Sequence, residues 1–153
     1  MKAIFDELDL SILEQLQDDG RKPFTRIAAE IGVSEATVRA RIQRLTRRKV
    51  VKFVASVDPH ALGLVYVRLA IRVQGPALRR ATEALTAIPE AIFVDVVSGG
   101  FDLMAEVVCR DPADLFRLLS DDIRTIPGVT QVETFHVMQT AKDQWRYSVL
   151  ADR

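Results

Sequence analysis

The apolar residues of the first 48 positions recur at i, i+3 and i+4, which predicts three consecutive helices. The first covers residues 6–16 and is capped by Asp6. The second covers residues 23–31, and the third begins after Ser34, whose hydroxyl suits a helix N-cap. The side chains that we expect to face the core are Leu8, Ile12, Leu13, Leu16, Phe24, Ile27, Ala28, Ile31, Val38, Ile42 and Leu45.

Beyond residue 49 the pattern changes to alternation, which is typical of half-buried strands. Residues 50–57 are rich in β-branched side chains and predict the wing and exit strand of a winged helix. A turn follows that ends at Gly63. We place the domain boundary there, which gives domains at 1–63 and 64–153.

The sequence predicts six secondary-structure elements in the second domain. They are a strand at 64–73, a helix at 76–87, strands at 92–97 and 101–108, a helix from Asp111-Pro112 and a strand at 129–138. This βαββαβ order is that of a ferredoxin-like unit, so the predicted fold class is α+β with a winged helix-turn-helix in front. Both helices would cover one face of the sheet. We expect Val and Leu on the other face, and therefore at least a homodimer through residues 64–140.

The third helix is unusually basic for a chain without net charge. Between Glu35 and Lys52 there are one acid and seven basic residues, namely Arg39, Arg41, Arg44, Arg47, Arg48, Lys49 and Lys52. A solvated helix face is the alternative interpretation. Like charges one turn apart destabilise an isolated helix by a few tenths of a kcal/mol per pair, so this pattern favours a polyanionic partner.

Two helices joined by the short turn at 32–34, the second of them basic, form a helix-turn-helix arrangement that predicts binding to double-stranded DNA. The N-terminal part of such a helix reaches base edges, and its later basic residues lie nearer phosphates. We expect base contacts from Ala36, Thr37, Arg39 and Ala40, and phosphate contacts from Arg44, Arg47, Arg48 and Lys52. The complete expected DNA-binding set is Ser34, Ala36, Thr37, Arg39, Ala40, Arg41, Gln43, Arg44, Arg47, Arg48 and Lys52.

The composition, 48% hydrophobic and 27% charged, is that of a globular protein. No apolar run approaches the ~18 residues that span a bilayer. The first ten residues carry acids where a signal peptide would be basic and then apolar, so we expect an intracellular protein with no membrane partner.

Few residues suit catalysis or metal binding. Cys109 is the single cysteine, which excludes an intrachain disulfide, and we expect its thiol to be buried. His60 and His136 are far apart, and no phosphate-binding or dinucleotide-binding fingerprint is present. We therefore expect no catalytic residues, no metal and no cofactor.

Four stretches carry a resemblance to a known family. They are FDELDLSILEQLQDDGR, IAAEIGVSEATVRARIQRL, VDPHALG, and the Gly-x-x-Asp pattern Gly99-Gly100-Phe101-Asp102. Over nearly the whole chain they resemble the Lrp/AsnC, or feast/famine, family of prokaryotic transcription regulators. The chain departs from that pattern in having Lys49 where the family usually has Gly, Pro23 where it usually has Ser or Thr, and Val132 and His136 where Thr and an aliphatic residue are common. Thr134 matches.

The resemblance implies a cytoplasmic, nucleoid-associated regulator that dimerises through its C-terminal sheets and assembles further, often to an octamer. It also implies an amino-acid-like effector bound between dimers, near a site composed of Ser98, Gly99, Gly100, Phe101, Asp102 and Thr134. Gly99 and Gly100 would allow close backbone approach, and Asp102 would pair with the ammonium group of the effector. Thr134, on the strand that we expect beside the hairpin, would add a hydroxyl contact. The alternative is that these glycines only make the turn.

Two other functions remain open. A nucleoid-organising protein would bind DNA with little sequence preference and without an effector. Sirohaem decarboxylases resemble this chain in their two-domain architecture. Such an enzyme, however, would bring His and basic residues to a tetrapyrrole and would not need an Arg-rich helix. Here His is scarce and the basic residues lie on the third helix, so we expect a protein that is not an enzyme.

Overall fold

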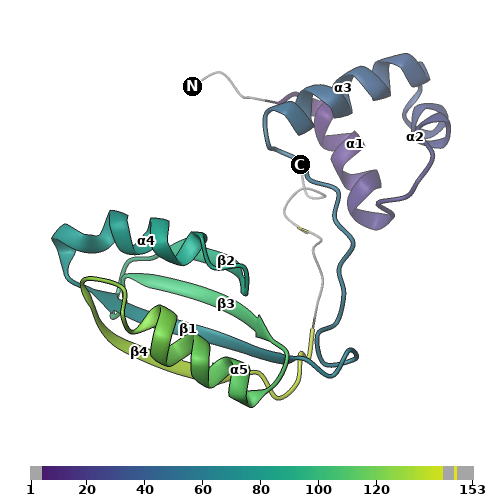
Figure 1. The fold of residues 1–153 in the computed structure, drawn as a ribbon. Helices are drawn as coiled ribbons and strands as arrows, with labels where there is room; N and C mark the ends of the chain where they lie inside the picture. Colours follow the sequence, from purple (N-terminus) through teal and green to yellow (C-terminus); the bar gives the residue numbers. More distant parts are fainter. Residues whose placement is uncertain (1–4, 143–146, 148–153) are drawn as a thin grey trace. The chain divides into compact units, whose positions relative to one another are not determined.

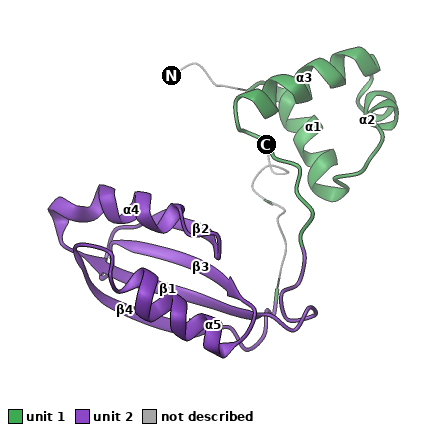
Figure 2. Cartoon of the chain, in the orientation of Figure 1, with its two compact units in different colours: residues 1–56, 142–153 green, residues 57–141 purple. Residues whose placement is uncertain are grey.

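The computed structural model describes residues 5–142 and 147, which form two compact units (Figure 1). Of these residues, 5–56, 142 and 147 belong to the first unit and 57–141 to the second (Figure 2). The second unit thus begins before the Gly63 boundary placed from the sequence. The turn ahead of Gly63 packs on the sheet that follows, since the His60 ring lies edge-on to the Tyr66 ring with centroids 6.2 Å apart.

The first unit consists of three helices, α1 (Glu7–Asp18), α2 (Phe24–Ile31) and α3 (Glu35–Arg47). Asp6 and Asp9 cap α1 reciprocally, because each carboxylate accepts a hydrogen bond from the other residue's backbone N–H, at 3.0 and 3.1 Å. The apolar stripes of the three helices meet in one core, which confirms the predicted helices. Its buried members are Ile12, Leu16, Ile27, Ala28, Val38 and Ile42.

Lys49 ends α3 in a left-handed backbone conformation, with φ 58°. Its N–H donates to the carbonyl of Thr46 at 2.9 Å, and the N–H of Val50 donates to the carbonyl of Leu45 at 2.9 Å. Glycine usually holds this position of a helix cap, because a Cβ atom in that conformation costs roughly 1 kcal/mol. The chain therefore keeps the cap geometry with an unfavourable residue.

The strand predicted at residues 50–57 is wrong for the single chain. Residues 51–58 form no helix or strand, and Phe53, Val54 and Val57 are 48%, 68% and 59% exposed. The composition suits a strand, but a strand also needs a neighbour to share its backbone hydrogen bonds. Within the part of the chain that the structure describes, no other strand pairs with this segment.

The second unit is a four-stranded antiparallel sheet with helices on one face (Figure 1). The strands are β1 (Val65–Val73), β2 (Ala91–Val96), β3 (Leu103–Cys109) and β4 (Val129–His136), in the order β2-β3-β1-β4. The helices are α4 (Leu78–Thr86), which follows the 3₁₀ turn η1 (Gly75–Ala77), and α5 (Pro112–Arg117), which continues into the π-helical segment η2 (Leu118–Ile123). The ferredoxin-like prediction is confirmed.

Strand alternation separates the two faces of this sheet sharply. The face under the helices is apolar and buried, with Val67, Leu69, Ile71, Leu103, Ala105 and Val107 packed on Ala81, Leu85, Leu118 and Ile123. This core also holds Cys109, whose side chain is buried as predicted and whose thiol pKa is raised by that burial.

Of the Val and Leu residues that the sequence led us to expect on the open face, Val108 lies there, opposite Tyr66, but most of the others face the helices. The open face is mostly aromatic and charged. Phe93, Glu106, Arg68 and Phe135 stand opposite one another across the four strands. Tyr66 Oη donates to Glu106 at 2.6 Å, and Arg68 pairs with the same carboxylate at 3.1 Å. The expectation failed because the alternation in β1 and β3 places most of the branched residues on the helix side.

Candidate nucleic-acid interface and effector hairpin

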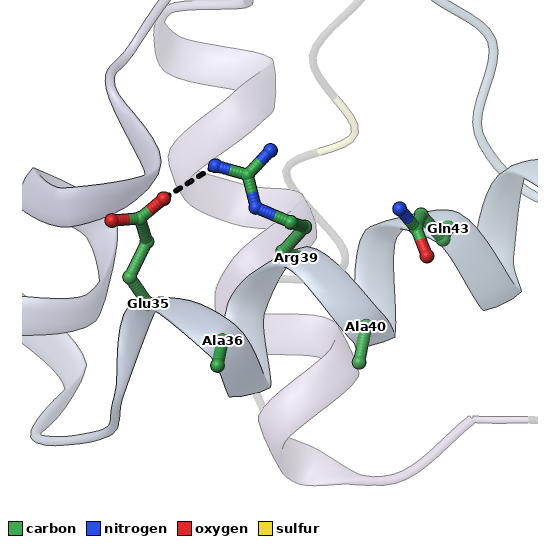
Figure 3. Close-up of a pocket in the computed structure, with 5 residues that line it drawn as sticks. All are labelled: Glu35, Ala36, Arg39, Ala40 and Gln43. Atoms are coloured by element: carbon green, nitrogen blue, oxygen red, sulfur yellow. Dashed lines mark hydrogen bonds and ion pairs between the residues drawn. The ribbon is translucent and has the colours of Figure 1, made fainter.

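The outward face of α3 presents a shallow hollow formed by the first three turns of the helix. Its lining residues are Glu35, Ala36, Arg39, Ala40 and Gln43 (Figure 3). Ser34 caps the helix, since its hydroxyl accepts from the N–H of Thr37 at 3.1 Å and lies 2.8 Å from the Thr37 hydroxyl. Ser34 and Thr37 therefore help to build the start of α3, while Ala36, Arg39, Ala40 and Gln43 are exposed.

Arg39 is held on this face from two sides. Its Nη2 atom donates to Glu35 Oε1 at 2.5 Å, and its guanidinium carbon lies 5.5 Å from the centroid of the Phe24 ring on α2. Its side chain is nevertheless 56% exposed. A second hollow continues from Arg39 along the side of α3 that faces α2. Its lining residues are Phe24, Arg39, Ile42, Gln43, Thr46 and Arg47.

Four residues that line these hollows, Glu35, Phe24, Ile42 and Thr46, were not among the expected site residues. In the sequence Glu35 stands out only as the single acid among the basic residues, and Phe24 and Ile42 are expected only as core residues. Glu35 and Arg39 are four positions apart, a spacing that predicts an ion pair on a helix. The contribution of α2 could not be read in this way, because it depends on how the two helices pack.

Arg41 and Arg44 point to α1, although the sequence placed them with the DNA-facing residues. Arg41 pairs with Asp6 at 2.5 Å and with Asp9 at 3.2 Å, and Arg44 donates to the other oxygen of Asp9. The side chain of Asp9 is fully buried, so its charge requires these partners. The hydrogen bond from Arg41 holds the pKa of Asp6 at about 2. Both arginines therefore join α3 to α1. Arg47, which lines the second hollow, and Arg48 and Lys52 are instead exposed.

The connection between β2 and β3, residues 97–102, is fastened to the end of β1. Asp102 donates its N–H to the carbonyl of Ile71 at 3.0 Å and accepts from the N–H of Val73 at 2.8 Å. Arg72 donates to the carbonyl of Gly100 at 2.7 Å, and its guanidinium carbon lies 5.6 Å from the Phe101 ring centroid.

The tip of this hairpin is open to solvent. Ser98, Gly99 and Gly100 are exposed, whereas Phe101 and Asp102 are half-buried. Gly99 has a φ of 142°, a conformation that side chains rarely adopt. The exposed tip and the half-buried Asp102 thus belong to one short segment.

Thr134 is separated from the hairpin by a strand. It is an exposed residue of β4 that stands opposite Leu69 of β1, and β1 lies between β4 and β3. The expectation that Thr134 sits on the strand next to the hairpin is wrong, because the strand order is decided by the whole βαββαβ topology.

Residues 5–142 and 147 contain neither a metal-binding cluster nor a membrane-spanning helix. In that range no cluster of three or more His, Cys, Asp or Glu side chains has the geometry to hold a metal ion. Nor does any helix there combine the length and the apolar character needed to cross a membrane.

The two units match two known domain families. The AsnC-type helix-turn-helix domain matches residues 5–46, and the Lrp/AsnC ligand binding domain matches residues 65–146. An uncharacterised HTH-type transcriptional regulator of Pyrococcus abyssi is 35% identical, with 96% of this chain and 93% of the relative covered. The HTH-type transcriptional regulator FL11 of Pyrococcus horikoshii is 33% identical, with 94% and 95% covered.

A solved structure agrees with these matches. The leucine response regulatory protein of Mycobacterium tuberculosis superposes with a TM-score of 0.82 at 26% identity, and the match covers 94% of this chain and 99% of that chain. Both units, in this order, are therefore shared with full-length relatives. The chain belongs to the Lrp/AsnC family of transcriptional regulators, with a helix-turn-helix unit followed by a ligand-binding domain.

Proposed function

We propose that the protein recognises specific DNA sites through the outward face of α3. We also propose that it is not an enzyme and that it needs no cofactor. The observation that carries the proposal is the composition of the α3 hollow. Ala36 and Ala40 are small enough to let a base edge approach, and Arg39 and Gln43 are the side chains that pair bidentately with guanine and adenine. Arg47, Arg48 and Lys52 supply exposed positive charge for phosphates.

The test is a selection from random duplexes, followed by fluorescence anisotropy on the selected sequence and a scrambled copy at the same salt concentration. A site-specific regulator binds the selected duplex at least ~10³-fold more tightly. Equal affinity for both duplexes would instead support a nucleoid-organising protein. A Soret absorption band in the purified protein would overturn the proposal that it is not a haem-processing enzyme.

We further propose that the ligand-binding domain responds to an amino acid or a related metabolite at the 97–102 hairpin, between dimers. An α-amino acid needs an acceptor for its ammonium and donors for its carboxylate. Asp102 and the backbone amides of the exposed residues Gly99 and Gly100 supply both within four residues. A thermal-shift screen of the amino acids tests this proposal, because a ligand at about a hundred times its Kd adds ~2.7 kcal/mol to the free energy of unfolding.

Assembly is the third part of the proposal. On the open sheet face Phe93 and Phe135 are 48% and 50% exposed at the two ends of the Phe93–Glu106–Arg68–Phe135 row. A face with aromatic ends and an ion pair in its centre suits contact with a second copy of itself. We therefore propose a dimer through the second unit. Membership of the family further supports the proposal that dimers assemble to an octamer on the nucleoid. Sedimentation at micromolar concentration tests the assembly, and a monomeric mass would contradict it.

A further inference from the structure

The carboxylate of Glu35 lies inside the surface that the proposed function assigns to DNA. Glu35 is the only acid in the sequence between Ser34 and Lys52. It lines the α3 hollow beside Ala36 and Ala40, and its side chain is 39% exposed. A negative charge there opposes the attraction of the basic helix for any phosphate backbone. Its presence in this position calls for a physical reason.

Stabilising the helix is one such reason, since a carboxylate in the first turn interacts favourably with the positive end of the helix. That role does not require the carboxylate to bond to a particular side chain. In the structure Glu35 Oε1 accepts from Arg39 Nη2 at 2.5 Å (Figure 3). The Phe24 ring bounds the same guanidinium group at 5.5 Å. Glu35 and Phe24 together hold Arg39 in one orientation over the hollow.

The pair presents a donor group and an acceptor group side by side. In the major groove guanine accepts at O6 and N7, and its partner cytosine donates from the N4 amino group. Arg39 suits the guanine acceptors, and the carboxylate of Glu35 suits the cytosine donor. On a phosphate backbone the same carboxylate is repelled and reduces the contribution of Arg39 to non-specific binding.

We propose that Glu35 is a specificity-determining residue. It positions Arg39 and accepts a hydrogen bond from the cytosine of the guanine–cytosine pair that Arg39 contacts, while it weakens binding to DNA without that pair. This inference rests on the proposed DNA-binding function and deepens it.

The first experiment compares the wild-type protein with Glu35→Ala on the selected and scrambled duplexes at one salt concentration. The proposal expects the ratio of the two affinities to fall about tenfold in Glu35→Ala, with the scrambled duplex bound as tightly as before or more tightly. Glu30→Gln is the matched control, because it removes a salt-bridged acid from α2 that does not line the hollow. It should leave the ratio unchanged.

The second experiment removes the cytosine amino group instead of the carboxylate. Each cytosine of the selected duplex is replaced in turn by 2-pyrimidinone, which lacks the N4 group. At one position the wild-type protein should lose about tenfold in affinity, while Glu35→Ala, which has no acceptor to lose, should change little. Equal losses for both proteins at every position would overturn the contact.

Three other outcomes would contradict the inference. If Glu35→Ala weakens binding to both duplexes equally and lowers the unfolding temperature, Glu35 only stabilises α3 and the inference is wrong. If Glu35→Ala keeps the wild-type ratio, Glu35 has no part in specificity although the protein still recognises a site. If the wild-type protein itself does not discriminate between the duplexes, the proposed site-specific function fails, and the inference fails with it.

Discussion

Asp102 accepts a 2.8 Å hydrogen bond from the backbone N–H of Val73. The pairing of β1 with β4 changes register between Arg72 and Val73, so the carboxylate supports the backbone where the strand ladder is interrupted. The residue proposed to bind the effector ammonium thus also holds its own hairpin against β1. Its two roles can be separated by substitution.

Asp102→Asn should keep the protein folded and remove its response to an amino acid. Asparagine can still accept from the Val73 N–H, but it lacks the charge that pairs with an ammonium. Asp102→Ala should also leave that N–H unpaired and lower the free energy of unfolding by about 1–3 kcal/mol. Urea unfolding and the thermal shift with the amino acid found in the screen measure the two effects. An unchanged affinity in Asp102→Asn would reduce Asp102 to a turn residue.

Arg39→Ala and Arg47→Ala should affect DNA binding differently. Loss of a bidentate guanine contact from Arg39 should cost ~1–3 kcal/mol on the selected duplex and much less on a scrambled one. Loss of a phosphate contact from Arg47 should weaken both about equally and reduce the salt slope by ~1. Anisotropy titrations at several salt concentrations separate the two patterns. An unchanged specificity ratio in Arg39→Ala would show that Arg39 does not read bases.

Arg44→Ala should act on stability, because Arg44 is one of the partners of the buried Asp9 carboxylate. Removing one partner of a fully buried pair costs about 3–5 kcal/mol. Arg41 remains beside Asp9, and the Arg44 side chain is 35% exposed, so we expect about 2 kcal/mol. Arg47→Ala is the matched control and should leave urea unfolding unchanged. Equal stability of the two variants would show that the contact with α1 contributes little.

Acid should destabilise both units over the same range. The hydrogen bond from Arg41 lowers the pKa of Asp6 from 3.8 to about 2, and the bond from Arg110 does the same for Asp114. A depressed carboxyl pKa adds stability that is complete above the unfolded value and disappears as the pH falls through the folded value. Unfolding free energy should therefore decline between about pH 4 and pH 2.

The variant Asp6→Asn tests how much of the loss of stability at low pH comes from Asp6. Its unfolding should depend less on pH in that window, and high salt should reduce the difference from wild type because Asp6 is exposed. A pH profile identical to that of the wild-type protein would mean that the Asp6–Arg41 pair is not maintained in solution.

Lys49→Gly should stabilise the first unit. Glycine adopts φ 58° without the steric cost that lysine bears there, and the gain after the added freedom of the unfolded chain should be about 0.5–1 kcal/mol. Lys49→Ala removes the charge but keeps the Cβ atom, so it should bring no such gain. If both variants gained equally, relief of charge repulsion among the neighbouring basic residues would be the cause.

Much of the local structure was determined by the sequence itself. The caps at Asp6 and Ser34, the helical stripe of Val38, Ile42 and Leu45, and the alternation in β1 involve residues within a few positions of one another. Such patterns depend on helix and strand geometry alone, so the elements and their buried faces could be predicted. Where a pattern needed a distant partner it failed, as at residues 51–58, whose strand-like composition meets no pairing strand among the described residues.

The tertiary structure decided which charges remain available to a partner. Arg39 and Arg44 look alike in the sequence, yet Arg39 stays on the outer face with Glu35, and Arg44 pairs with Asp9, 35 positions away. The bond from Val73 to Asp102 and the strand that separates Thr134 from the hairpin are also long-range. The physical reason is the same in each case. A charged or polar side chain pairs with whatever the packing of separate elements brings within about 3 Å, and local periodicity carries no information about that packing.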